Sequence, residues 1–383
     1  MAFTTSRRNI LLGGAGLSLG GCAASSASVT ARSSAIAAQS TGDAANFLGP
    51  TSGIAKLNSN ENPYGPSASA RRLIDYAGSK GAYYADHKVG YLGAMIAERH
   101  GLDAEAVTVS AGSAEALSAM AVVFGKKGPI IAPRLSFDET LLYAERLGLA
   151  EVQHAPMAED LSLDLPALEA MVTTDTGMVQ ICNPNNPTGM LSDAATLKAA
   201  VKRMSQKTTV IVDEAYIELT DDPEANSCVD LVKAGYNVIV ARTFSKLYGM
   251  AGIRVGYTIS SPETAEKIRA GLMTWMSGVS IAAAVGCYND TAFIEDSRSK
   301  LLQGREMVTE TLDVLGLDAR PSQASFVFFK SGKDANTVQQ AFADRGILIR
   351  GQYLDYSEWS RVSMGYLEDV ERFCKTLPEI ISA

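Results

Sequence analysis

The stretch VIVARTFSKLYGMAGIR, residues 238–254, decides which fold class fits this chain. It opens on Val238–Ala241, four apolar residues with the length and composition of a strand that is buried on both faces. A loop rich in glycine, serine and aromatic residues follows and contains Lys246. A lysine that serves only as a solvated charge is an odd choice for such a loop, although an exposed lysine is the commoner outcome for this motif taken alone.

Apolar bursts of strand length recur on both sides of this stretch and alternate with amphipathic helical patterns. The other predicted strands are Val107–Val109, Pro129–Ala132, Gly177–Ile181, Thr209–Val212 and Arg254–Ile259, and the predicted helices are Glu115–Phe124, Phe137–Leu147, Ala194–Met204 and Pro262–Met273. Strands that are apolar throughout, with helices between them, indicate an α/β fold with a mostly parallel sheet covered by helices on both faces. Ligands of such sheets bind at the carboxyl ends of the strands, so we expect functional residues directly after the apolar bursts.

The pattern changes near residue 291 and predicts a second, smaller α+β domain at the C-terminus. It consists of a long helix, a Phe-rich strand, a helix and a short strand, predicted at Asp296–Leu315, Ser325–Phe329, Thr337–Asp344 and Ile347–Arg350. We therefore predict an N-terminal arm over 46–80, a large domain over 81–290 and a small domain over 291–383.

Composition excludes several classes of protein. The chain has 383 residues, a formal net charge of −8 and no basic cluster, which argues against a nucleic-acid binder. No run reaches the roughly 18 apolar residues that a membrane-spanning helix needs. Three histidines and five cysteines, none in a CxxC pair, predict no metal site.

The first residues resemble an export signal rather than part of the fold. Arg7 and Arg8 precede a short apolar stretch that ends in Leu19-Gly20-Gly21-Cys22. The paired arginines are typical of a twin-arginine signal, and the last four residues resemble a lipobox in which Cys22 carries lipid. We therefore expect export over 1–22, a flexible tether over 23–45, and a protein that is periplasmic or membrane-tethered; an apolar tail without a targeting role is the alternative.

Three further motifs follow predicted strands, and each alone has an ordinary structural explanation. NPNNPTG (183–189) reads as a turn. In VDEAY (212–216), Asp213 could be a helix cap and Tyr216 a packing residue. In SAGSAE (110–115), the glycine permits close backbone approach, and we expect Ser113 to cap a helix whose free N–H groups can bind an anion.

Taken together, the four motifs bring a lysine, a carboxylate, a phenol, an amide and an anion site to one edge of the sheet. This set matches the needs of pyridoxal 5′-phosphate. A lysine amine can form a Schiff base with its aldehyde, and a carboxylate can keep its ring nitrogen protonated so that the ring accepts electrons. A helix N-terminus, a hydroxyl group and an arginine can bind its phosphate.

The chain resembles the class I/II, fold-type I, pyridoxal-phosphate-dependent aminotransferases, and among these it is most similar to the histidinol-phosphate aminotransferases. The arm sequence LNSNENPYGP (57–66) and the four motifs carry the resemblance, which spans about 54–367. It implies a transaminase that moves an amino group, in two half-reactions, between an amino acid or amino-alcohol phosphate and a 2-oxo acid such as 2-oxoglutarate.

The resemblance also implies roles for individual residues. Lys246 would form the Schiff base, Asp213 would pair with the ring nitrogen, and Tyr216 and Asn186 would bond the ring oxygen; Ser113, Ala114, Thr243, Ser245 and Arg254 would bind the phosphate. Tyr84 would reach the phosphate of a neighbouring subunit, which implies a homodimer with shared active sites. Arg361 would bind the substrate α-carboxylate, Arg350 would lie near the substrate, and Asn62 would lie near the distal group of the substrate.

The sequence departs from the family pattern near Pro133. Leu135 occupies the place where the family usually has an aromatic ring stacked on the cofactor, unless a small shift lets Phe137 serve. Ala85 replaces the proline that usually follows Tyr84. Other pyridoxal-phosphate reactions on the same fold stay open as alternatives (an amino-acid phosphate decarboxylase, a β-lyase or a racemase), as does a non-catalytic exported binding protein.

Overall fold

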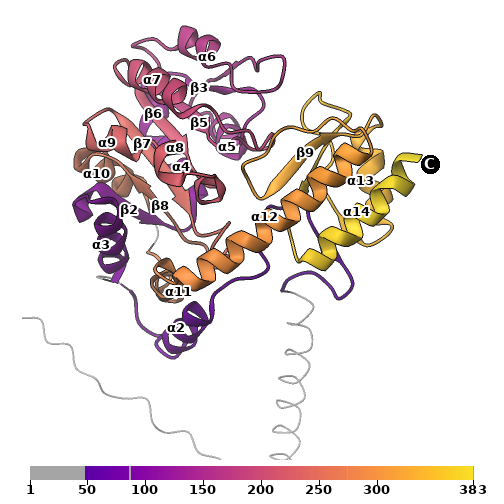
Figure 1. The fold of residues 1–383 in the computed structure, drawn as a ribbon. Coiled ribbons are helices and arrows are strands. Elements are labelled where there is room, and N and C mark those ends of the chain that lie inside the picture. Colours follow the sequence, from indigo (N-terminus) through magenta and orange to yellow (C-terminus); the bar gives the residue numbers. More distant parts are fainter. Residues whose placement is uncertain (1–47, 86–87, 274, 383) are drawn as a thin grey trace, which may run out of the picture. The chain divides into compact units, whose positions relative to one another are not determined.

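The computed structural model describes residues 48–85, 88–273 and 275–382 (Figure 1). The predicted export signal over 1–22, including Cys22, and the predicted tether over 23–45 lie outside the described residues. Gly53–Ala383 form one compact unit. Within the described part of the chain, no helix is both long enough and apolar enough to cross a membrane.

A seven-stranded sheet forms the centre of the N-terminal two thirds of this unit. In spatial order its strands are β2 (Val107–Ser110), β8 (Gly256–Ile259), β7 (Val238–Thr243), β6 (Thr209–Asp213), β5 (Met178–Cys182), β3 (Ile130–Pro133) and β4 (Val152–Ala155). Strands β7, β6, β5, β3 and β4 pair in parallel, which confirms the predicted mostly parallel sheet. Strand β8 is antiparallel to both of its neighbours, because the chain returns from β7 through a loop without a crossover helix.

Alternating residues of the central strands pack into two separate cores. In β6, Val210 and Val212 belong to one core and Ile211 to the other; in β7, Val238 and Val240 alternate in the same way with Ile239. One core includes residues of α3 (Lys88–His100), α6 (Leu165–Met171), α7 (Ala194–Ser205), α9 (Val229–Lys233) and α11 (Gly278–Tyr288), and the other includes residues of α4 (Ser113–Phe124), α5 (Glu139–Arg146) and α10 (Pro262–Gly271). Burial on both faces explains why these strands are apolar at every position.

The sequence prediction missed strand β4, which lies at the edge of the sheet. Gln153 and His154 make it half polar, and of its four residues only Ala155 is buried. An edge strand has one neighbour and needs no continuous apolar run, so it lacked the signal that revealed the central strands.

The C-terminal third begins with the long helix α12 (Thr291–Val314), which runs toward β9, α13 and α14 (Figure 1). Strand β9 (Phe326–Lys330) pairs antiparallel with β11 (Trp359–Ser363), and the two-residue strand β10 (Ile347–Leu348) pairs in parallel with β1 (Ala55–Lys56). Helices α13 (Ala335–Ala343) and α14 (Leu367–Ser382) pack with them around a third core. The arm that contains β1 thus adds a strand to this layer before it reaches α2 (Ala68–Gly78).

Short helical elements complete the fold. They are the four-residue α8 (Pro223–Asn226) and three 3₁₀ turns, η1 (Ala104–Ala106), η2 (Gly125–Lys127) and η3 (Ile217–Leu219). Element η3 directly follows Tyr216, and its Leu219 packs in the core of the C-terminal layer.

Candidate active site

A cavity of about 440 Å³ lies at the carboxyl ends of β5, β6 and β7, where the apolar bursts end. Its lining comes from the arm (Asn58, Ser59, Asn60, Glu61), the start of α4 (Ser113, Ala114), the segment after β3 (Ser136, Phe137, Asp138, Glu139), the ends of β5 and β6 (Cys182, Asn186, Asp213, Ala215, Tyr216), the loop after β7 (Thr243, Ser245, Lys246, Ala251, Arg254) and the C-terminal layer (Arg350, Tyr353, Arg361). Every predicted site residue except Asn62 and Tyr84 therefore lines one cavity.

Lys246 and Asp213 are ionisable groups that both line this cavity, and burial shifts the pKa of each. Burial, together with the positive charge of Arg361, lowers the pKa of Lys246 to about 8. Burial raises the pKa of Asp213, which is 3% exposed, to about 7. The lysine amine is thus available in its neutral form near neutral pH, and the carboxylate, which accepts one hydrogen bond from the Ala215 N–H (3.1 Å), has capacity for a further donor.

The start of α4 and the loop after β7 form an anion-binding corner. Gly112 caps the helix with a φ of +88°, and a Cβ at this position would collide with the guanidinium of Arg254. Arg254 Nη1 donates to Ser245 Oγ (3.2 Å), and the Ser245 N–H donates to Thr243 Oγ1 (3.1 Å). The prediction that Ser113 caps this helix is wrong: Ser113 is its first residue, because the chain turns at the glycine.

Two arginines of the C-terminal layer, Arg350 and Arg361, line the same cavity. The backbones of Arg350 and Arg361 bond to each other in both directions at 2.9 Å. Arg361 Nη1 donates to Asn186 Oδ1 (2.6 Å) and Nη2 donates to the Asn58 carbonyl (2.9 Å), whereas its buried Nε has no partner among the described residues. An unpaired buried N–H on a guanidinium is a donor for an anionic ligand.

Tyr216 and Tyr353 line the cavity between the charged groups. The amine of Lys246 lies 5.5 Å from the ring centre of Tyr216, whose hydroxyl accepts a hydrogen bond from Asn60 Nδ2 (3.0 Å). Burial raises the pKa of Tyr216, so the phenol stays protonated. The guanidinium groups of Arg350 and Arg361 lie 5.4 and 5.6 Å from the ring centre of Tyr353.

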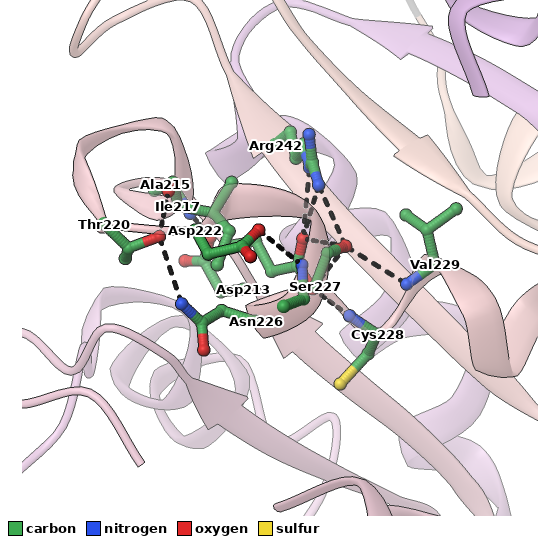
Figure 2. A network of polar contacts seen from close by, with 12 residues as sticks. Asp213, Ala215, Ile217, Thr220, Asp222, Asn226, Ser227, Cys228, Val229 and Arg242 are labelled. Atoms are coloured by element: carbon green, nitrogen blue, oxygen red, sulfur yellow. Dashed lines mark hydrogen bonds and ion pairs between the residues drawn. The ribbon is translucent and has the colours of Figure 1, made fainter. Parts of the chain in front are cut away.

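A buried polar network supports the turn that carries Asp213 (Figure 2). The carboxylate of Glu214 accepts hydrogen bonds from Arg242 Nη2 (2.9 Å), Ser227 Oγ (2.8 Å) and the Cys228 N–H (2.6 Å). Arg242 neutralises the charge of Glu214, and hydrogen bonds hold its carboxylate. The side chain of Glu214, the residue next to Asp213, therefore has one fixed orientation.

The arrangement fits the chemistry of pyridoxal phosphate. An amine of lowered pKa, a buried carboxylate with room for an N–H donor, and a corner of backbone N–H groups, hydroxyls and an arginine match the aldehyde, the ring nitrogen and the phosphate of that group. Among the described residues, no cluster of three or more His, Cys, Asp or Glu could hold a metal ion.

Comparison with known proteins decides the family. The model of the family described as "Aminotransferase class I and II" matches residues 52–377. The chain belongs to this aminotransferase family. The membership confirms the predicted resemblance, the fold class and the prediction of a pyridoxal-phosphate-dependent transaminase.

Individual relatives of this aminotransferase agree with the family match. A histidinol-phosphate aminotransferase of Symbiobacterium thermophilum is 34% identical over 328 residues, which cover 85% of this chain and 90% of the relative. The crystal structure of the histidinol-phosphate aminotransferase of Sinorhizobium meliloti, in complex with pyridoxal-5′-phosphate, superposes with a TM-score of 0.79 at 28% identity and covers 86% of this chain and 91% of that one. The enzyme of the same name from Clostridium acetobutylicum gives a TM-score of 0.78 at 26% identity, with 86% and 99% of the two chains covered.

Two of the residues predicted for the site of this aminotransferase do not line the cavity. Asn62 is buried, and its amide bonds to Ser297 and to the carbonyl of Leu247. Tyr84 is 82% exposed and packs edge-on against Trp275, with 5.0 Å between ring centres.

The structure also separates the two candidates for the stacking position. Leu135 is 1% exposed and is not part of the cavity lining, and its carbonyl accepts a hydrogen bond from Asn185. Phe137 lines the cavity. The aromatic side chain on this wall therefore comes two residues later than in the family pattern.

Sequence reasoning missed several lining residues of the aminotransferase. Asn58, Asn60 and Glu61 belong to the quoted arm motif, but nothing in the motif says which of its side chains face the site. Tyr353 lies in an irregular segment without a pattern, and Asp138 belongs to the predicted helix Phe137–Leu147 but precedes the first residue of α5 in the structure, so neither position pointed to the cavity.

Proposed function

We propose that this transaminase takes the amino group of histidinol phosphate, or of a closely related amino-alcohol or amino-acid phosphate, and passes it to a 2-oxo acid such as 2-oxoglutarate. Arg350 and Arg361, which line the same cavity as Lys246, carry the proposal, because a fixed guanidinium on Arg361, with a second one on its backbone-paired neighbour, suits a donor with a strongly anionic group close to its amine. The names of the relatives support this choice of donor.

The residues of the cavity divide into those that would hold the cofactor and those that would hold the donor. Lys246 would bind pyridoxal phosphate covalently, with Asp213 at the ring nitrogen and Tyr216 and Asn186 at the ring oxygen. Phe137 would cover the ring, and the phosphate would lie among Ser113, Ala114, Thr243, Ser245 and Arg254. When bound, the cofactor supplies an electron sink for the charge that develops at the donor α-carbon.

Lys246 would be the base that moves the α-proton of the donor. Its pKa of about 8 leaves a useful fraction of neutral amine at neutral pH, and the same group can return a proton, as both half-reactions require. Asp213 would keep a proton at the ring nitrogen, because a buried carboxylate gains from a charged N–H partner.

Arg361 would anchor the anionic group of the donor. Its contacts with Asn186 and the Asn58 carbonyl fix the plane of the guanidinium and leave Nε free to donate. Arg350, on the same face, would contact the donor more loosely because it is exposed. Tyr353 lies close to both guanidinium groups and would stabilise their charge through its ring face.

A homodimer forms part of the proposal. Tyr84 lies outside the cavity of its own chain and borders a hollow of about 1120 Å³ that is also lined by Tyr76, Tyr83, Tyr91 and Trp275. All of these rings are exposed, and a second copy that covered them would bury a large apolar area. Tyr84 would then complete the phosphate site of the partner. Co-expressed Lys246→Ala and Tyr84→Ala chains test this, because a mixed dimer would regain one intact site and a monomer none.

Export is proposed from the sequence alone. Arg7, Arg8 and Cys22 support twin-arginine export, followed by residence in the periplasm or lipid tethering. Cell fractionation of the full chain tests this: replacement of both arginines by lysine should keep the enzyme in the cytoplasm, and Cys22→Ala should release it from the membrane. Wild-type enzyme found only in the cytoplasm would contradict the proposal.

A single half-reaction tests the chemistry most clearly. Holoenzyme mixed with histidinol phosphate and no 2-oxo acid should release one equivalent of carbonyl product per active site and then stop. Lys246→Ala should release none. Repeated turnover without an acceptor, or release of carbon dioxide from an amino-acid phosphate, would instead indicate a lyase or a decarboxylase, and no reaction with any amine would favour a binding protein.

A further inference from the structure

The side chain of Asn62 is fully engaged by groups behind the cavity. Its Nδ2 donates to the Leu247 carbonyl and to Ser297 Oγ, both at 2.6 Å, and its Oδ1 accepts from the Tyr64 N–H at 3.1 Å. Ser297, on α12, also donates to the Leu247 carbonyl at 3.1 Å. Asn62 is 5% exposed and Ser297 is fully buried, so these bonds are shielded from water.

The Leu247 carbonyl belongs to the turn that carries Lys246. The Gly249 N–H closes this turn on the Lys246 carbonyl at 2.9 Å. The arm packs directly on the turn: a Cβ at Gly65 would lie 2.6 Å from the Tyr248 carbonyl oxygen, and a Cβ at Gly249 would collide with Gly65. Backbone therefore lies against backbone, and Asn62 provides the polar contact at the centre of this junction.

We propose that Asn62 is a positioning residue for Lys246: together with Ser297 it clamps the Leu247 carbonyl, and so fixes the turn from which the lysine amine reaches the reacting atoms. The role of Lys246 in this statement rests on the proposed function. Asn62 acts through the turn, since the groups that could contact a substrate are already bonded elsewhere.

The neighbouring residues of the arm show why the clamp matters. Asn58 bonds through its carbonyl to Arg361, Asn60 bonds through its amide to Tyr216, and Asn62 bonds to the turn after Lys246. The arm thus contacts Arg361, Tyr216 and the turn that carries Lys246 through alternate residues. These contacts fix the positions of the three groups relative to one another. A small displacement of a proton-transfer group costs rate because the transfer depends steeply on distance.

The test compares two full-length holoenzyme variants that remove hydrogen bonds of the arm on opposite sides: three bonds of the Asn62 side chain and one bond of Tyr366. Asn62→Ala removes the clamp. Tyr366→Phe removes the bond from Tyr366 to the Pro63 carbonyl (3.0 Å), which anchors the arm on the side away from the turn. Asn62→Ala should lower kcat about tenfold or more and leave KM for the amino donor nearly unchanged. Tyr366→Phe should leave both constants near the wild-type values.

A spectroscopic readout separates positioning from a general loss of stability. The visible absorbance of the bound cofactor is titrated against pH, because the nitrogen of Lys246 controls it. In the free lysine, burial and the charges of Arg361 and Arg254 lower the pKa of the amine, while Asp213 and Glu61 raise it, and the same surroundings would act on this nitrogen in the holoenzyme. A looser, wetter turn in Asn62→Ala should move the midpoint upward by about half a unit or more, and Tyr366→Phe should not move it.

A second variant keeps the test decisive if Asn62→Ala does not fold. Ser297→Ala removes the other donor to the Leu247 carbonyl without touching the arm, and it should change kcat and the midpoint in the same direction by a smaller amount. Wild-type kcat and midpoint in the folded variant, or equal shifts in Tyr366→Phe, would overturn the inference. Visible cofactor absorbance that persists unchanged in Lys246→Ala would contradict the proposed function instead.

Discussion

Arg350 and Arg361 form a hydrogen-bonded antiparallel pair: each backbone N–H donates to the carbonyl of the other at 2.9 Å. Residues in such a pair project their side chains on the same face, so both guanidinium groups lie at one wall of the cavity. The backbone pairing thus places both arginines on the same side of the cavity before a donor binds.

Arg361→Lys should lower kcat/KM for every amino donor by about 10- to 100-fold, as expected when a charged, planar hydrogen-bond contact is lost. A lysine keeps the charge but cannot bond Asn186, the Asn58 carbonyl and the donor together. Steady-state kinetics measure the effect. Arg345→Lys, on the exposed end of the C-terminal layer, is the control and should behave like wild type; equal losses in the two variants would argue against a substrate role for Arg361.

Gly112→Ala should raise the dissociation constant of pyridoxal phosphate at least about tenfold, because its Cβ collides with Arg254 at the anion-binding corner. Equilibrium dialysis with apoenzyme measures it. Gly235→Ala is the matched control: Gly235 has a similar φ of +81° but nothing within 4 Å of the added Cβ. If both variants lose the same affinity, backbone strain rather than the corner is responsible.

Arg242→Ala should lower the free energy of unfolding by about 3–5 kcal/mol, because it leaves the buried carboxylate of Glu214 without its cation. Urea denaturation of the apoenzyme measures the loss. Arg203→Ala, which breaks an exposed pair with Glu169, should cost far less. Similar losses in the two variants would mean that the network in Figure 2 does not stabilise the turn after β6.

Asp213 should make the apoenzyme less stable as the pH rises. Burial raises its folded pKa to about 7, so the stability it contributes is complete below its ordinary pKa and is lost as the pH rises through 7. Asp213→Asn removes this loss. The free energy of unfolding of Asp213→Asn, relative to wild type, should therefore increase between pH 4 and 7 by up to about 1.4 kcal/mol per pH unit.

Asp193→Asn provides a control of opposite sign for that titration. Hydrogen bonds from Thr196 lower the pKa of Asp193, so its contribution is present above its ordinary pKa and is lost as the pH falls. Relative to wild type, this variant should lose stability as the pH rises. A flat difference for Asp213→Asn would show that the carboxylate is not desolvated in the apoenzyme.

The central strands and the residues after them were predictable because a strand that is buried on both faces requires a continuous run of apolar residues. Asp213 is the last residue of β6, and Lys246 follows β7 by three residues, so the same runs located both. Strand β4 lacked that signal because it is a half-polar edge strand in which only Ala155 is buried, whereas the other edge strand, β2, is buried at all four positions.

The residues that reach the site through long-range contacts were harder to predict. Asn62 matches a family motif, but its side chain contacts Leu247 and Ser297, which are distant in sequence and signalled by no pattern around them. Phe137 lines the cavity and Leu135 does not, because the Leu135 side chain is buried in the protein interior after β3. In both cases the direction of a side chain depends on packing against segments far along the chain.

The central claim is that Lys246 is the residue joined to pyridoxal phosphate. Holoenzyme is reduced with sodium borohydride, which makes the carbon–nitrogen link permanent, then digested and mapped by mass spectrometry. The account predicts one pyridoxyl group per chain, on Lys246, and none in Lys246→Ala. A label on any other lysine, or an unlabelled Lys246 in active enzyme, would contradict it.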